Sequence, residues 1–111
     1  MLVSSSSPFG SKTRTLVLLA LHLMEESFAR ELARVLEAPL NGIQQALRGL
    51  EADGIVVGRS AGRTRLFRLN PRYFARLELE RYLRRLAEPE AELRNRLASL
   101  RRRPRRTGKP L

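Results

Sequence analysis

The fold is decided by residues 27–69, which read SFARELARVLEAPLNGIQQALRGLEADGIVVGRSAGRTRLFRL. Over the first part of this stretch, apolar residues recur every three or four positions, which indicates helices with one buried face. A first helix is predicted over residues 27–37, with Ser27 as its N-cap. A second is predicted over residues 39–53, because Pro39 suits the first turn of a helix. About two residues join these helices, so they pack closely as a pair.

The spacing of apolar residues changes after Gly54, which is predicted to cap the second helix. Residues 55–59 and 65–69 are short runs rich in β-branched and aromatic side chains. Residues 60–63, Ser-Ala-Gly-Arg, have the composition of a turn. The sequence therefore predicts a β-hairpin directly behind the helix pair.

Further helices are expected on both sides of this stretch. Residues 11–24 carry a wide apolar stripe and predict a helix before the pair. Asn70 followed by Pro71 predicts the start of a helix after the hairpin, and Pro89 divides it from a last helix. The expected organisation is a flexible arm (1–10), a globular unit (11–70), C-terminal helices (71–100) and a basic disordered tail (101–111).

The predicted order of helix, helix, helix, hairpin and helix is that of a winged helix-turn-helix. The expected fold class is mainly α with a small β-hairpin, a three-helix core plus wing with a C-terminal helical extension. One helix fits the major groove of DNA and presents its polar face to base edges. On the helix predicted over residues 39–53, the side chains expected to read bases are Asn41, Gln44, Gln45 and Arg48. The alternative is that they form an ordinary solvated helix face.

The hairpin favours the DNA-binding interpretation, because it is basic and has no acidic residue. A basic wing beside a polar helix is suited to contact phosphates or the minor groove. The wing residues expected to do so are Arg59, Arg63, Arg65 and Arg68.

Three motifs together carry a resemblance to a known family. They are R-E-L-A-R in the helix predicted over residues 27–37, L-R-G-L-E-A-D-G-I at the end of the helix predicted over residues 39–53, and G-R-T-R-L-F-R-L in the hairpin. Residues 8–87 resemble the winged helix-turn-helix domain of ArsR-type transcriptional regulators, especially a version found fused to some nucleotidyltransferases. The resemblance implies a recognition helix from Pro39 and a wing over residues 59–68. Two departures are that Glu37 stands where many such turns have glycine, and that no nucleotidyltransferase domain is present.

Composition agrees with a nucleic-acid partner. The net charge is +11, and arginine supplies 20 of the 22 basic residues. Arginine pairs with phosphate and guanine in a bidentate manner. The alternative source of this excess is a GC-rich genome. The tail holds six basic residues and no acidic one, over half the net charge, and is expected to bind phosphates nonspecifically through Arg101, Arg102, Arg103, Arg105, Arg106 and Lys109.

Two interpretations fit the leucines of the C-terminal helices, which recur every seven residues at positions 79, 86, 93 and 100. One is a seam that joins two copies in a homodimer. The other is ordinary packing against the chain's own core. A dimer would read two half-sites about 10 base pairs apart, or a multiple of that spacing.

Several classes of site are not expected. The chain has no cysteine and one histidine, His22, within an apolar helix, so neither a disulfide nor a metal site is predicted. Glu25 and Glu26 are adjacent and point in different directions on a helix, so they predict no carboxylate pair. No catalytic residues and no cofactor are expected. The start resembles no signal peptide, and the apolar run at residues 16–23 is too short to span a membrane, so the expected location is the cytoplasm.

Three functions follow from these observations. The first is sequence-specific binding of double-stranded DNA by a transcriptional regulator of repressor type. The second is a protein-interaction module that assists a separately encoded enzyme such as a nucleotidyltransferase. The third is RNA binding, which six aromatic residues, mostly at predicted core positions, support least because they offer few stacking surfaces.

Overall fold

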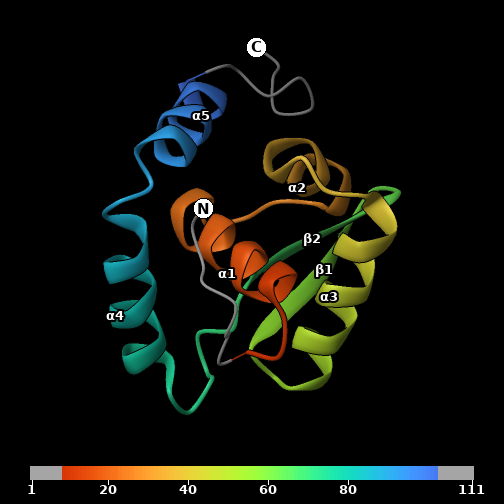
Figure 1. The fold of residues 1–111 in the computed structure, drawn as a ribbon. Helices are drawn as coiled ribbons and strands as arrows, with labels where there is room; N and C mark the ends of the chain where they lie inside the picture. Colours follow the sequence, from red (N-terminus) through yellow and green to blue (C-terminus); the bar gives the residue numbers. More distant parts are fainter. Residues whose placement is uncertain (1–8, 103–111) are drawn as a thin grey trace.

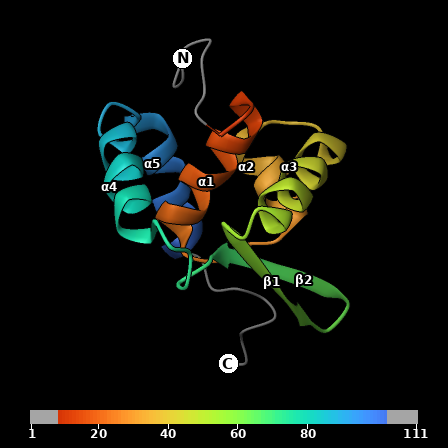
Figure 2. The same ribbon diagram turned by 90° about the horizontal axis from the view of Figure 1, so that it is seen from below.

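The computed structural model describes the backbone of residues 9–102, and the side chains in that range except those of residues 91, 92 and 99–102 (Figure 1). The described elements are α1 (Lys12–Met24), α2 (Ala29–Leu36), α3 (Leu40–Ala52), β1 (Val56–Ala61), β2 (Thr64–Leu69), α4 (Arg76–Ala87) and α5 (Ala91–Arg102). The protein is mainly helical with one antiparallel two-stranded hairpin, as predicted. In Figure 2, α1 lies in the middle, α2 and α3 flank it on one side, and α4 and α5 on the other.

Helix α1 is the centre of the hydrophobic core. Its middle turns are buried on every side, from Val17 to Leu21. A helix that is apolar all round is stable only where other elements surround it. Its first turn is capped by Ser11, whose hydroxyl accepts a hydrogen bond from the backbone N–H of Arg14 at 3.1 Å. The prediction of a helix over residues 11–24 is confirmed.

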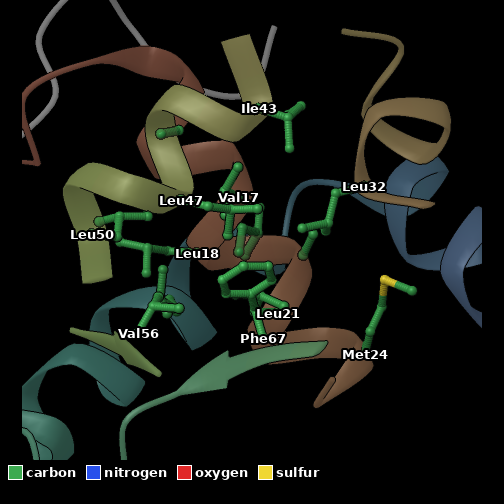
Figure 3. Packing of buried hydrophobic residues seen from close by; sticks show 14 of the residues in the cluster. Val17, Leu18, Leu21, Met24, Leu32, Ile43, Leu47, Leu50, Val56 and Phe67 are labelled. Carbon is green, nitrogen blue, oxygen red and sulfur yellow. The ribbon is translucent and has the colours of Figure 1, made fainter. Parts of the chain in front are cut away.

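The helix pair and the hairpin complete the core on one side of α1 (Figure 3). Side chains of α2 and α3 meet α1 with less than a tenth of their surface exposed, and the hairpin adds one residue from each strand below them. The residues concerned are Leu32, Val35, Ile43, Ala46, Leu47, Leu50, Val56 and Phe67. The apolar spacing of residues 27–69 therefore marks the buried faces of these elements.

Ser27 does not cap α2, contrary to the sequence prediction. The N-cap is Phe28, and Ser27 instead exchanges two backbone hydrogen bonds with Phe67 of β2, at 3.1 and 2.7 Å. Its hydroxyl donates to Oε1 of Glu31 at 2.6 Å. The expected cap is lost because a tertiary contact with the hairpin holds Ser27 in an extended conformation, and this contact ties the start of α2 to the wing.

The turn between α2 and α3 is formed without glycine. Glu37 adopts the left-handed conformation, with φ of 54°, which costs an L-residue about 1–2 kcal/mol. The N–H of Ala38 donates to the carbonyl of Ala33 at 3.0 Å, which is a hydrogen bond typical of helix ends capped by a left-handed residue. Arg96 of α5 adds support, because it donates to the carbonyl of Val35 and lies 3.6 Å from a carboxylate oxygen of Glu37.

The hairpin turn is shorter than predicted. The strands pair from Val56 opposite Leu69 to Ala61 opposite Thr64, so only residues 62 and 63 lie outside the ladder. Gly62 takes a φ of 65°, which glycine adopts easily and which suits the first position of a two-residue turn. The expectation of a four-residue turn over residues 60–63 is therefore wrong, because Ser60 and Ala61 pair with Arg65 and Thr64 as part of the strands.

Helix α4 begins at Arg76, five residues later than predicted. Asn70 does not cap it: its side-chain amide donates to the carbonyl of Gly54 at 2.8 Å, and its oxygen accepts from the N–H of Arg72 at 2.9 Å. Asparagine readily bonds backbone groups in turns as well as at helix starts. Here it joins the end of the hairpin to the end of α3, where Gly54 has the positive φ expected of a cap.

The C-terminal helices belong to the same core as the rest of the chain. Leu79 and Leu83 of α4, and Leu93 and Leu97 of α5, are buried within a single cluster that includes α1. Ordinary core packing is thus confirmed for these four leucines, while Leu86 is only partly buried against the same cluster and the side chain of Leu100 lies outside the described residues. Pro89 separates α4 from α5, as predicted.

Helix α5 continues to Arg102, two residues past the expected boundary of the tail. The remaining tail residues, Arg103, Arg105, Arg106 and Lys109, and most of the N-terminal arm lie outside the described residues. Among the helices that are described, none combines the length and apolar character that crossing a membrane requires.

Candidate nucleic-acid interface

The four predicted base-reading side chains all lie on the outer surface of α3. Asn41, Gln44, Gln45 and Arg48 are exposed, whereas the apolar residues between them face the core. The helix is amphipathic because its polar and apolar residues alternate with helical period. The amide and guanidinium groups of α3 are therefore presented together on one surface.

An open groove of about 510 Å³ lies between this surface and the hairpin. Its walls come from the start of α2, the outer side of α3 and the turn end of β2. The lining residues are Phe28, Ala29, Arg30, Gln44, Leu47, Arg48, Glu51, Arg63, Thr64, Arg65 and Phe67. Gln44 and Arg48 line the groove; Asn41 and Gln45 do not.

The groove has a basic rim and an apolar floor. Four arginines, from α2, α3, the hairpin turn and β2, line it against one acidic residue, Glu51. Phe28, Leu47 and Phe67 supply apolar surface. A concave site with mostly one sign of charge concentrates the potential inside it. The groove therefore attracts anions.

The predicted wing arginines divide into two kinds. Arg65 donates from Nη1 and Nη2 to the two carboxylate oxygens of Glu51, at 3.2 and 2.8 Å. Arg59 lies 3.1 Å from a carboxylate oxygen of Glu26, outside the groove. Arg63 and Arg68 are exposed and form no ion pair with any residue that the structure describes. Of these four arginines, only Arg63 both lines the groove and lacks an acidic partner.

Arg65 is held in place by more than its carboxylate partner. Its guanidinium carbon lies 5.0 Å from the centre of the Phe67 ring, within the range of a cation–π contact. The hydrogen bonds from Arg65 to Glu51, and then the charge of Glu51, raise the pKa of Arg65. The side chain is therefore a fixed charge in the wall of the groove.

Arg30 is a groove residue that the sequence analysis missed. It lies in the first turn of α2, is exposed, and has no acidic partner in the part of the chain that is described. A cation at this position opposes the helix dipole, which favours negative charge at a helix start. That local conflict in the motif R-E-L-A-R was a signal in the sequence that Arg30 serves something other than helix stability.

His22 is far from this interface, on α1. Burial is the main cause that lowers its pKa below the usual value of 6.5; the charge of Arg84 lowers it further, and Glu80 opposes the shift. Over the described range, no three acidic or histidine side chains gather in a way that would hold a metal ion.

The order of α2, α3 and the antiparallel hairpin is consistent with the expected helix-rich fold with a small β-hairpin wing. Comparison of the sequence with models of known protein families, and with characterised proteins, gives no significant match.

Proposed function

We propose that the protein is a sequence-specific, double-stranded DNA-binding protein that regulates transcription. The observation that carries the proposal is the basic groove between α3 and the hairpin, where Arg30, Arg48 and Arg63 come from three different elements and have no acidic partner in the described part of the chain. The motifs that resemble ArsR-type regulators support the same function.

The proposed mode of binding follows from the dimensions of the elements. Helix α3 enters the major groove, whose width admits one helix, and presents Asn41, Gln44, Gln45 and Arg48 to base edges. A DNA backbone strand then runs through the groove between α3 and the hairpin. Its phosphates meet Arg30 and Arg63, which position the protein without reading sequence.

Three further proposals complete this function. The protein acts in the cytoplasm, where a regulator meets bacterial or archaeal DNA. It binds as a homodimer, so that two recognition helices engage two half-sites. The basic residues at the end of the chain add nonspecific contacts with phosphates.

Fluorescence anisotropy tests this function. The labelled duplexes are the region upstream of the protein's own gene and a random sequence, each titrated from about 50 to 200 mM salt, because phosphate contacts weaken steeply over this range. Tight binding of the upstream duplex, with much weaker binding of random DNA, is the expected result. Equal and weak binding that disappears by 200 mM salt contradicts a sequence-specific regulator.

A protein-docking function is the second candidate, and one observation favours it. Phe74 is 91% exposed and Leu77 is 59% exposed, beside and on α4, and neither lines the basic groove. Large apolar side chains at a surface often mark a contact with another protein. Phe74→Ser separates the candidates, because it weakens a protein contact and leaves DNA binding unchanged.

A further inference from the structure

The basic groove contains one carboxylate, and that carboxylate is bound to one of the groove's own arginines. Glu51 lies in the last turns of α3, and both of its oxygens accept hydrogen bonds from Arg65 of β2. A bidentate pair of this kind is among the strongest and most directional hydrogen-bonded contacts between side chains. It links the recognition helix directly to the wing.

The hairpin is shaped to hold Arg65 in this orientation. A Cβ atom at Gly58 would lie 2.5 Å from Nη2 of Arg65 and 2.9 Å from Cε1 of Phe67. Glycine on β1 therefore lets the guanidinium lie across the strand, between the Phe67 ring and Glu51. Three separate features, the glycine, the ring and the carboxylate, fix one side chain.

Arg65 thus differs from the other arginines of the groove. Arg30, Arg48 and Arg63 form no ion pair with the residues that the structure describes, so their donors are open to phosphate. Glu51 occupies two of the five N–H donors of Arg65, and its negative charge offsets the charge of the guanidinium. One of the four positive charges of the groove is therefore neutralised within the protein itself.

We propose that Glu51 is a specificity-determining residue of the DNA-binding site: it withholds Arg65 from phosphates and holds the wing at a fixed distance from α3. This inference rests on the proposed function. Phosphate contacts carry no sequence information, so withholding one lowers the affinity for every duplex by a similar factor. When the wing is held at a fixed distance from α3, it can contact the DNA backbone only where that backbone lies in the position set by correct base contacts of α3. Duplexes without those base contacts therefore lose the contact with the wing.

The substitution Glu51→Gln tests the proposal, with anisotropy measured on a random duplex and on a duplex chosen by selection from a random pool. We expect tighter binding of random DNA and a smaller ratio between the two affinities. One additional phosphate contact also makes the loss of random-duplex affinity between 50 and 200 mM salt about 3.5-fold larger. Glu26→Gln is the matched control, because Glu26 pairs with wing residue Arg59 and neither residue lines the groove.

The double substitution Glu51→Gln with Arg65→Gln shows whether the effect passes through Arg65. We expect the gain in random-duplex binding to disappear in the double variant. A gain that persists there overturns the proposal, because it would come from the carboxylate repelling phosphates by itself. Unfolding in urea checks that each variant is folded.

Failure of the proposed function and failure of the role of Glu51 give different experimental results. Wild-type protein that binds selected and random duplexes equally overturns the proposed function, and with it the inference. Wild-type protein that discriminates between them, together with a Glu51→Gln variant that has the same affinities and the same salt dependence, overturns the inference alone.

Discussion

Replacing Leu83 by alanine is expected to destabilise the monomer by about 3 kcal/mol. Leu83 lies on α4 and has no exposed surface, so the change removes its contacts with the core that centres on α1. Three carbon atoms lose burial at about 0.8 kcal/mol each, and the cavity left behind adds to this. This loss is a large fraction of the free energy of unfolding of a typical domain, which is roughly 5–15 kcal/mol.

Leu77→Ala is the matched control, because it makes the same change on the same helix at a site that is 59% exposed. Less than half of the side chain loses burial there and no cavity forms, so we expect a loss of about 1 kcal/mol or less. Urea denaturation of both variants, followed by circular dichroism, measures the two free energies of unfolding.

Two results would refute the reasoning about Leu83. The first is an equal loss of stability in both variants, which would mean that α4 is not packed as the structure describes. The second is a wild-type unfolding midpoint that rises with protein concentration and loses that dependence in Leu83→Ala, which would place Leu83 in a seam between two chains.

Three further predictions concern the proposed DNA-binding surface, the turn between α2 and α3, and His22. Arg48→Ala is expected to reduce discrimination between bases by about 1–3 kcal/mol. Arg63→Ala is expected to weaken binding of all duplexes alike and to lower the slope of log affinity against log salt by about 0.9. Identical effects of the two substitutions in anisotropy would contradict these separate roles. Glu37→Gly is expected to raise the free energy of unfolding by about 0.5 kcal/mol, because the strain of a left-handed L-residue is larger than the entropic cost of glycine. Glu37→Ala keeps this strain and should therefore be less stable than the glycine variant in urea. The lowered pKa of His22 means that the unfolded chain takes up a proton more readily than the folded one, so stability falls as pH drops through about 6.5. His22→Gln removes this contribution, and equal slopes of stability against pH in both proteins would show that His22 is not buried as described.

The spacing of apolar residues was enough to predict the helices, the hairpin and their order. That spacing reports which face of each element is buried, and burial is the largest favourable contribution to folding. It predicted the inward face of α3 and therefore also the outward set from Asn41 to Arg48.

Two of the failed predictions of local structure, the helix caps, involve polar residues that can form hydrogen bonds in more than one way. Ser27 and Asn70 are residue types that often serve as N-caps, yet each forms hydrogen bonds with a distant part of the chain. Ser27 bonds with Phe67, and Asn70 bonds with Gly54. A cap contributes about 1 kcal/mol, which a tertiary contact can replace. No short stretch of sequence reveals which partner is chosen.

The candidate site could be predicted only in part for a similar reason. The sequence showed that arginines are numerous in the hairpin, but Arg65 and Arg59 find carboxylates 14 and 33 positions away along the chain. Arg30 comes into the groove only because α2 starts beside β2. Which charges remain available to a ligand is therefore a property of the fold.

Selection of duplexes from a random pool, followed by anisotropy of the selected and unselected duplexes, tests the central claim most directly. We expect a common sequence to be enriched and to bind at least about 1,000-fold more tightly than random DNA, as is usual for sequence-specific proteins at physiological salt. It also predicts that Arg48→Ala reduces this ratio. A pool that stays random after selection, with equal affinities for all duplexes, would contradict the claim that α3 and the wing form a site that reads DNA sequence.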